Sequence, residues 1–283
     1  MLNNMPINRL NEDTKRIIMF TIIGIICFIS IILAVVFSVL QESPEVPNKD
    51  VEVEVKEKEI IDFSSIFDNK LNNQEYEIRF IEKLIDDKEI VYSKFEINEK
   101  VNEKFDLDIK IPAINIDSLE VATINEEIDA IFAEKARNII TSEEDYETIY
   151  TVEYTAYINS NILSLVIKSN LKEGLNAQRV IVKAYTYNMT TNDLIDIDEM
   201  LSIKQLNRVD VQKEINNVVA QNAKEAQNLI DLGYKVYERN LSDEMYKIEN
   251  IDNFFYGPNG ALYIIYAYGN GSYTSELDIV TFR

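Results

Sequence analysis

The chain has 283 residues and a formal net charge of −21, from 49 acidic and 28 basic side chains, and it contains no histidine. The missing histidine excludes Ser-His-Asp and Cys-His nucleophile systems and histidine zinc sites. Cys27 is the single cysteine, so the chain cannot form an internal disulfide. The acidic surface disfavours nucleic acid and favours cations or basic proteins as partners, although solubility alone also explains the charge.

Residues 17–40 form an uncharged, almost wholly apolar run without a counterpart elsewhere in the chain. A helix of about 20 residues crosses a hydrocarbon core about 30 Å thick, so this run predicts one transmembrane helix. Arg9, Lys15 and Arg16 precede it and mainly acidic residues follow, which predicts a cytoplasmic N-terminus and an extracellular C-terminal part. A cleaved signal peptide is the alternative, but such peptides have a shorter apolar core and a small-x-small cleavage site.

These features predict a single-pass protein of the cell membrane with four parts. They are a short cytoplasmic tail (1–16), the transmembrane helix (17–40), an acidic juxtamembrane linker (41–73) and an extracytoplasmic domain (74–283). An apolar content of 46% and sixteen tyrosines indicate that the domain has a packed core.

The first elements of the domain are predicted from its periodicity. Apolar and charged residues alternate over 105–111, which predicts a half-buried strand that Pro112 closes. Ser118 is placed to cap a helix, because apolar residues at helical spacing follow it as far as Phe132.

The rest of the chain predicts further strands and a second long helix. The strands are expected at 150–158, 162–171, 178–188, 261–268 and 277–282, with a short helical turn at 195–201 and the long helix at 209–232. This order predicts an α+β fold in which two helices pack on an antiparallel sheet.

Tyrosines gather in and beside the last predicted hairpin. The candidate ligand-binding residues are Tyr256, Tyr263, Tyr266, Tyr268 and Tyr273. Aromatic faces with polar tips suit glycan stacking or a protein interface, and packing in the core is the competing explanation. The loop 269–272 lacks the lysine and the following helix of a phosphate loop, so it is predicted to be a flexible turn.

The densest short acidic cluster offers weak candidates for a metal site, namely Asp193, Asp196 and Asp198. Carboxylate oxygens are the ligands that calcium takes, but the central glycine of an EF-hand loop is missing. Helix capping by Asp196 and ordinary solvation explain the cluster more simply, so we expect no metal and no cofactor. The cations of the central hairpin are expected to pair with acidic side chains on the surface; they are Lys168, Lys172, Arg179 and Lys183.

Four segments resemble the extracytoplasmic module shared by the anti-sigma-V factor RsiV and the N-terminal region of PdaC-type peptidoglycan deacetylases. They are IKIPAIN (109–115), NILSLVIKSN (161–170), VKAYTYNMTTNDLIDIDEML (182–201) and NFFYGPNGALYIIYAYG (253–269). Members of that family usually carry a Gly-Gly-Ala-His stretch after the second segment, whereas here 171–178 reads LKEGLNAQ. The resemblance implies a shared outer module without a deacetylase domain. Sixteen residues before the span are too few for a sigma-binding domain, so no anti-sigma activity is expected.

We therefore expect a non-enzymatic, membrane-anchored binding or sensing module outside a bacterial cell. The resemblance implies a cell-wall fragment or a basic extracellular protein such as lysozyme as its ligand. Two alternatives remain open. One is an enzyme that acts on cell-wall glycan with paired carboxylates, one of them desolvated. The other is a structural partner within an envelope complex.

Overall fold

The computed structural model describes residues 61–72, 84–144 and 146–283. No helix within these ranges is long and apolar enough to cross a membrane. The predicted transmembrane helix, the predicted cytoplasmic tail and the linker as far as residue 60 lie outside the described residues.

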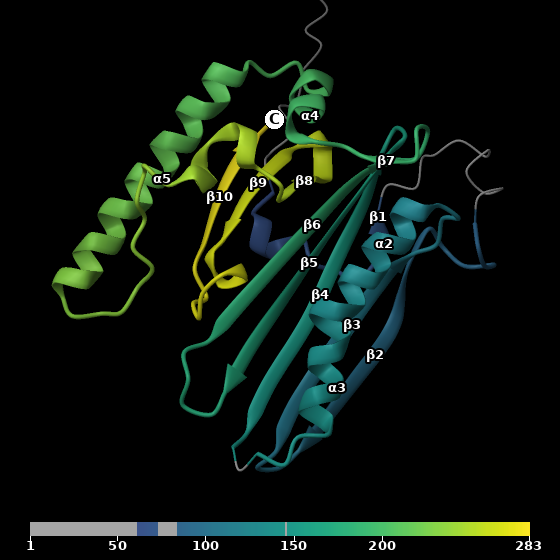
Figure 1. Ribbon diagram of the computed structural model, residues 1–283, viewed down its shortest axis with the longest axis vertical. Helices are drawn as coiled ribbons and strands as arrows, with labels where there is room; N and C mark the ends of the chain where they lie inside the picture. Colours follow the sequence, from purple (N-terminus) through teal and green to yellow (C-terminus); the bar gives the residue numbers. More distant parts are fainter. Residues whose placement is uncertain (1–60, 73–83, 145) are drawn as a thin grey trace, which may run out of the picture. The chain divides into compact units, whose positions relative to one another are not determined.

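The described residues form two β-sheets. The larger has the strand order β2-β3-β4-β5-β6-β7, with β1 paired to β4 beside this path (Figure 1). Its strands are β1 (Leu71–Asn72), β2 (Val91–Val101), β3 (Phe105–Ile114), β4 (Thr148–Asn159), β5 (Ile162–Glu173), β6 (Arg179–Asn188) and β7 (Asp193–Leu194). The α+β class is confirmed, but the expected purely antiparallel sheet is wrong because β3 and β1 both run parallel to β4. The connection from β3 to β4 passes through a helix, which is the crossover that parallel strands require.

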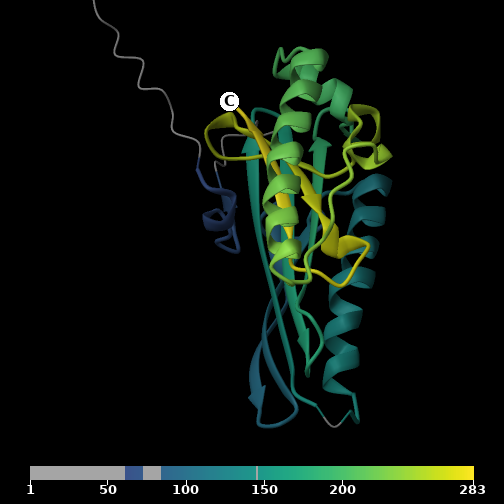
Figure 2. The same ribbon diagram turned by 90° about the vertical axis from the view of Figure 1, so that its left-hand side faces the viewer.

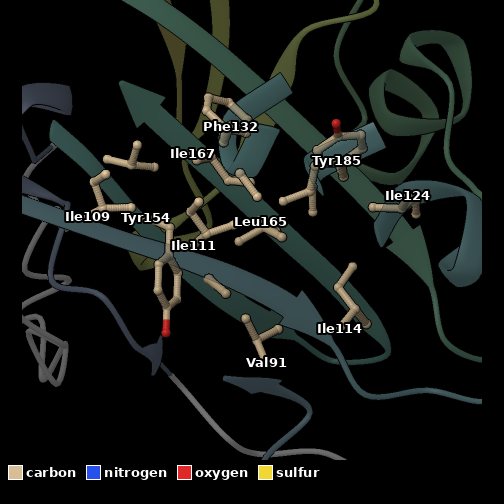
Figure 3. Close-up of a cluster of buried hydrophobic side chains, with 14 of the residues drawn as sticks. Val91, Ile109, Ile111, Ile114, Ile124, Phe132, Tyr154, Leu165, Ile167 and Tyr185 are labelled. Carbon is tan, nitrogen blue, oxygen red and sulfur yellow. The ribbon is translucent and has the colours of Figure 1, made fainter. Parts of the chain in front are cut away.

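That crossover helix covers one face of the large sheet. It consists of α2 (Leu119–Ile128), a π-helical turn η3 (Asp129–Ala133) and α3 (Glu134–Ile140). Ser118 caps it as predicted, because its hydroxyl accepts a hydrogen bond from the Val121 amide at 3.1 Å. Ile124 and Phe132 face the sheet and pack with strand residues such as Ile111 and Leu165 (Figure 3).

Pro112 does not end β3, contrary to the sequence prediction, since the strand continues to Ile114. Pro112 lies opposite Ser93, where the register of β2 shifts between Ser93 and Phe95. Parallel pairing with β4 has already ended at Ile109. A proline is tolerated where the ladder is irregular, because no regular bond needs its missing N–H.

The second sheet is a three-stranded antiparallel sheet of β8 (Phe254–Tyr256), β9 (Leu262–Ala267) and β10 (Leu277–Phe282). One of its faces packs on α5 (Arg208–Asp231), through residues such as Ile215 and Ile264. Figure 2 shows α5 crossing β9 and β10, and α4 (Ile197–Ile203) precedes it in the chain. The other face packs on β5 and β6 of the large sheet, where Val166 and Val182 meet Ile265.

Part of the predicted linker is folded. Phe63 and Ile66 are buried in the cluster between the two sheets, and the Tyr263 hydroxyl donates a hydrogen bond to the Ile61 carbonyl at 2.9 Å. Leu71 begins β1, which adds to β4. Residues 61–72 therefore belong to the packed structure of the domain.

Within the part of the chain that the structure describes, the outer edge of β6 has a strand partner only near its end, where β7 pairs with Tyr187 and Asn188. Further along, two asparagine side chains take the place of a strand. Asn270 accepts from the Val182 amide at 3.0 Å and donates to the Val182 carbonyl at 2.8 Å. Asn253 accepts from the Ala184 amide at 2.8 Å and also donates to the Val182 carbonyl, at 3.2 Å.

The asparagine side chains on the edge of β6 also join the two sheets. The Asn253 amide also donates to the Ile265 carbonyl of β9, and the Thr274 carbonyl accepts from the Val180 amide at 3.0 Å. Side-chain amides satisfy the peptide groups of β6 with the same donor and acceptor pair that a neighbouring strand offers. The loop 269–272, predicted to be a flexible turn, is therefore held against β6 by Asn270.

Gly269 is required by this close approach. A β-carbon at Gly269 would lie 1.8 Å from the Val180 carbonyl oxygen. We expect Gly269→Ala to destabilise the protein by about 3 kcal/mol, because backbone must move to relieve the overlap. Gly271→Ala is the matched control, since nothing lies within 4 Å of its β-carbon, and it is expected to stay within about 0.5 kcal/mol of wild type. Urea unfolding followed by circular dichroism measures both, and equal midpoints for the two variants would contradict the packing described.

Candidate functional site

A pocket of about 410 Å³ lies where the edge of β6 meets the second sheet. It is lined by aromatic and amide side chains beside a few apolar ones. The aromatic and polar members are Tyr237, Tyr266, Tyr268, Asn250, Asn253, Asn270, Ser272, Lys183 and Asp252. Asn253 and Asn270 are the residues that hydrogen-bond the edge of β6, so the contact between the sheets also fixes this side of the pocket.

The tyrosines that line this pocket, Tyr237, Tyr266 and Tyr268, are fixed by ring contacts with one another and with Tyr246. The rings of Tyr237 and Tyr268 stack, with centroids 4.0 Å apart and planes 17° from parallel. Tyr246 meets Tyr266 edge to face at 5.2 Å, and its hydroxyl lies 2.9 Å from that of Tyr268. These contacts leave the aromatic wall little freedom to rearrange.

The tyrosines contact a buried ion pair formed by Arg239 and Asp278. The Arg239 guanidinium donates to both carboxylate oxygens of Asp278, with Nε 2.9 Å and Nη2 3.0 Å from their nearest oxygens. Its Nη1 donates to Glu276 at 2.8 Å. The Tyr268 hydroxyl donates to Asp278 at 2.6 Å, and the Arg239 guanidinium lies 5.0 Å from the centre of the Tyr268 ring. Arginine suits this site because its planar fork satisfies two carboxylates at once.

Burial changes the acidity of these groups. It raises the pKa of Tyr268, and the hydrogen bond that Tyr268 donates to Asp278 adds to the rise. It also raises the pKa of Tyr246, to about 12. For Arg239, burial works to lower the pKa, but Asp278 and Glu276 outweigh it and the pKa is raised. The tyrosines therefore remain neutral hydrogen-bonding groups at physiological pH.

Tyr266 stands out because its hydroxyl is buried without a hydrogen-bond partner. The side chain is 5% exposed, and burial raises its pKa. A buried hydroxyl without a partner carries a desolvation penalty of about 1–3 kcal/mol. A polar group placed in the pocket that Tyr266 lines would supply the missing bond.

The structure separates the five tyrosines proposed from the sequence. Tyr266 and Tyr268 line the pocket, whereas Tyr256 and Tyr263 do not. Tyr263 is buried between the sheets. Tyr273 is 59% exposed, and the Arg179 guanidinium lies 5.2 Å from the centre of its ring.

The acidic cluster has structural roles. Asp196 caps α4 by accepting from the Glu199 amide at 2.8 Å, and Asp198 pairs with Arg208. Among the residues that the structure describes, no group of three or more acidic or thiol side chains is placed to hold a metal ion.

Sequence reasoning missed several residues of the site. Tyr237 and Arg239 follow α5 in an irregular segment, and their partners lie about 30 to 40 residues further on. Asn253 and Asn270 resemble turn residues in the sequence. Their hydrogen bonds to β6 span 69 and 88 positions, so no local pattern predicts them. Lys183 was predicted to form a surface ion pair, and it does pair with Glu127 at 3.0 Å, but it also lines the pocket.

No protein-family model and no curated protein matches this chain. Two solved structures that are similar to it are DUF3298 family proteins, both from bacteria. For the one from Pseudomonas aeruginosa PAO1 the identity is 11% and the TM-score 0.36, over 67% of this chain and 86% of the other. For the one from Bacteroides fragilis NCTC 9343 the identity is 11% and the TM-score 0.32, over 62% and 80%. At these scores the likeness assigns no function to this chain.

The buried ion pair gives a direct prediction. Arg239→Ala leaves Asp278 buried without its main partner, so we expect a loss of about 3–5 kcal/mol in unfolding free energy. Arg208→Ala is the control, because Arg208 pairs with two carboxylates on the surface, and its loss is expected to be about 1 kcal/mol or less. Chemical denaturation measures both; a loss for Arg239→Ala as small as that for Arg208→Ala would contradict the role given to Arg239.

Alkaline pH is expected to destabilise the domain through its buried tyrosines. The folded-state pKa of Tyr246, about 12, exceeds its ordinary value of 10.0. The stability that the neutral hydroxyl contributes is therefore complete below about pH 10 and is lost as the pH rises towards 12. Thermal melting between pH 9 and 12 measures the loss. Tyr246→Phe, which cannot ionise, is expected to show a shallower decline, and an identical decline in both proteins would contradict the assignment.

Proposed function

We propose that this chain is a non-enzymatic, membrane-anchored binding module whose extracytoplasmic domain takes a cell-wall fragment in the aromatic pocket. The observation that carries the proposal is the lining itself. Tyrosine faces with amide and hydroxyl groups beside them match the apolar faces, acetamido groups and hydroxyls of a wall saccharide. The unpartnered Tyr266 hydroxyl adds a point where a ligand would gain a hydrogen bond.

The size of the pocket favours a fragment over a protein. Small-molecule pockets measure about 300–1,000 Å³, and this one falls in that range at about 410 Å³. A protein such as lysozyme would instead need a contact surface of about 800 Å² on each partner. The resemblance to the outer module of RsiV and PdaC-type deacetylases is compatible with either ligand.

The carboxylates weigh against the enzymatic alternative. Among the described residues, Asp278 is the buried carboxylate. Arg239 and Tyr268 engage both of its oxygens. A glycosidase acid needs a carboxyl group that is desolvated, protonated and open to the substrate. Asp278 beside a cation does not meet that need.

Isothermal titration calorimetry of the full-length protein in detergent tests the proposal, with muropeptides as the ligand and lysozyme as a separate titrant. Muropeptides are expected to bind wild type, and Tyr266→Phe is expected to weaken that binding about two- to tenfold, the value of one hydrogen bond. The same variant is expected to melt at a higher temperature, because it removes a buried hydroxyl that has no partner.

Tyr256→Phe is the matched control, because Tyr256 lies outside the pocket lining, and its affinity is expected to stay within about twofold of wild type. Lysozyme binding without muropeptide binding would replace the wall fragment by a basic protein as the ligand. The pocket would lose its role if Tyr266→Phe bound muropeptides as tightly as wild type.

A further inference from the structure

A second pocket, of about 360 Å³, adjoins the aromatic pocket. The two share Lys183, Ile251 and Asp252 in their linings. The second pocket continues along β6 towards Thr186 and is bordered by α2 at Glu127 and by the start of α4 at Asp196. A ligand long enough to pass the shared residues would therefore occupy both pockets.

The second pocket differs from the first in its chemistry. Its apolar part is formed by Tyr185, Leu194, Ile195 and Phe254 together with the shared Ile251. Three carboxylates line it, those of Glu127, Asp196 and Asp252, against the single cation Lys183. Apolar surface beneath an excess of negative charge suits an aliphatic stem that ends in a cation.

The charged side chains of this pocket differ in whether they have partners within the protein. Glu127 pairs with Lys183 at 3.0 Å, and Asp196 accepts the capping bond from the Glu199 amide. Asp252 is exposed and has no hydrogen bond or ion pair with any described residue. Because Glu127 already balances Lys183, the carboxylates of Asp252 and Asp196 leave the pocket with a net negative charge.

A second observation points to a ligand here. Tyr185 is 6% exposed, and its hydroxyl is buried without a hydrogen-bond partner. Among the described residues, Tyr185 and Tyr266 are the side chains with such an orphaned buried polar atom. Tyr266 lines the aromatic pocket, and Tyr185 lines the second pocket. Burial raises the pKa of Tyr185, and the nearby Glu127 carboxylate adds to the rise, so the hydroxyl stays protonated beside the acidic side chains that line the pocket.

We propose that the second pocket is a subsite for a primary ammonium group on an aliphatic stem, as in a lysine or another diamino-acid side chain, carried by the ligand whose neutral part fills the aromatic pocket. Asp252 attracts the ammonium group, Tyr185 offers its hydroxyl oxygen as an acceptor, and the apolar residues contact the stem. This inference rests on the proposed function, since it extends the same binding site.

A matched pair of ligands tests the subsite on the full-length protein in detergent. One is a muropeptide that carries a lysine residue, and the other is the same molecule with that lysine Nε-acetylated, which keeps the stem and removes the charge. By calorimetry, wild type is expected to bind the lysine form about three- to tenfold more tightly, the range of a partly exposed charge pair with one added hydrogen bond. This preference is expected to shrink at high salt, because the pair is partly exposed.

Two variants locate the effect. Asp252→Asn and Tyr185→Phe are each expected to reduce the preference for the lysine form to about twofold or less. Tyr185→Phe is also expected to raise the melting temperature, as removal of an unpartnered hydroxyl should. Asp87→Asn is the control for net charge, because Asp87 lines neither pocket, and it is expected to keep the wild-type preference.

The outcomes separate this inference from the function on which it rests. Equal affinity of wild type for both ligand forms, with binding still weakened by Tyr266→Phe, would overturn the cation subsite and leave the aromatic site standing. A preference that Asp252→Asn and Tyr185→Phe leave intact would also overturn it. If neither ligand form binds wild type, the proposed function and the subsite are both wrong.

Discussion

The edge of β6 sets the constraint on which the rest of the domain depends. Its peptide groups at Val180, Val182 and Ala184 are covered by the second sheet, where water cannot satisfy them, and each would be costly to leave unpaired. Asn253 and Asn270 supply the missing donors and acceptors from opposite ends of the segment that contains β8 and β9. Because an amide side chain must meet a peptide group within about 3 Å, the four hydrogen bonds that these two side chains make to β6 fix the second sheet against the first.

The aromatic pocket follows from that arrangement. The second sheet meets β6 through side chains and a loop and not through a regular strand, so the sheets do not merge and a pocket remains beside their contact. Arg239 ties the segment after α5 to β10 through Asp278, and Asp278 in turn accepts the hydrogen bond that holds Tyr268 in place. The same polar groups that stabilise the junction therefore preorganise the tyrosine wall, and a ligand would meet a site that is already formed.

The sequence predicted the elements better than their arrangement. Alternation located β3, the predicted ranges of β4 to β6 end within two residues of the observed strands, and Ser118 located the start of α2 because capping is a local interaction. Parallel pairing of β3 with β4 was missed, although the helix between them was predicted and a crossover of that length permits it. The burial of Tyr263, Tyr266 and Tyr268 was also open to prediction. β9 reads as a nearly continuous apolar run, which is typical of a strand covered on both faces, here by α5 and by the large sheet.

The rest of the site lay beyond sequence reasoning, because its residues act over long distances in the chain. Asn253 and Asn270 have the local signature of turns, and only the fold brings them to β6. The orphaned hydroxyls of Tyr185 and Tyr266 are similar, since the sequence shows two ordinary strand tyrosines. Phenylalanine at either position would keep the packing and avoid the desolvation penalty. The hydroxyls therefore make no contribution to stability that the structure shows. Under the proposed function, a ligand that occupies the two adjoining pockets would complete both hydrogen bonds.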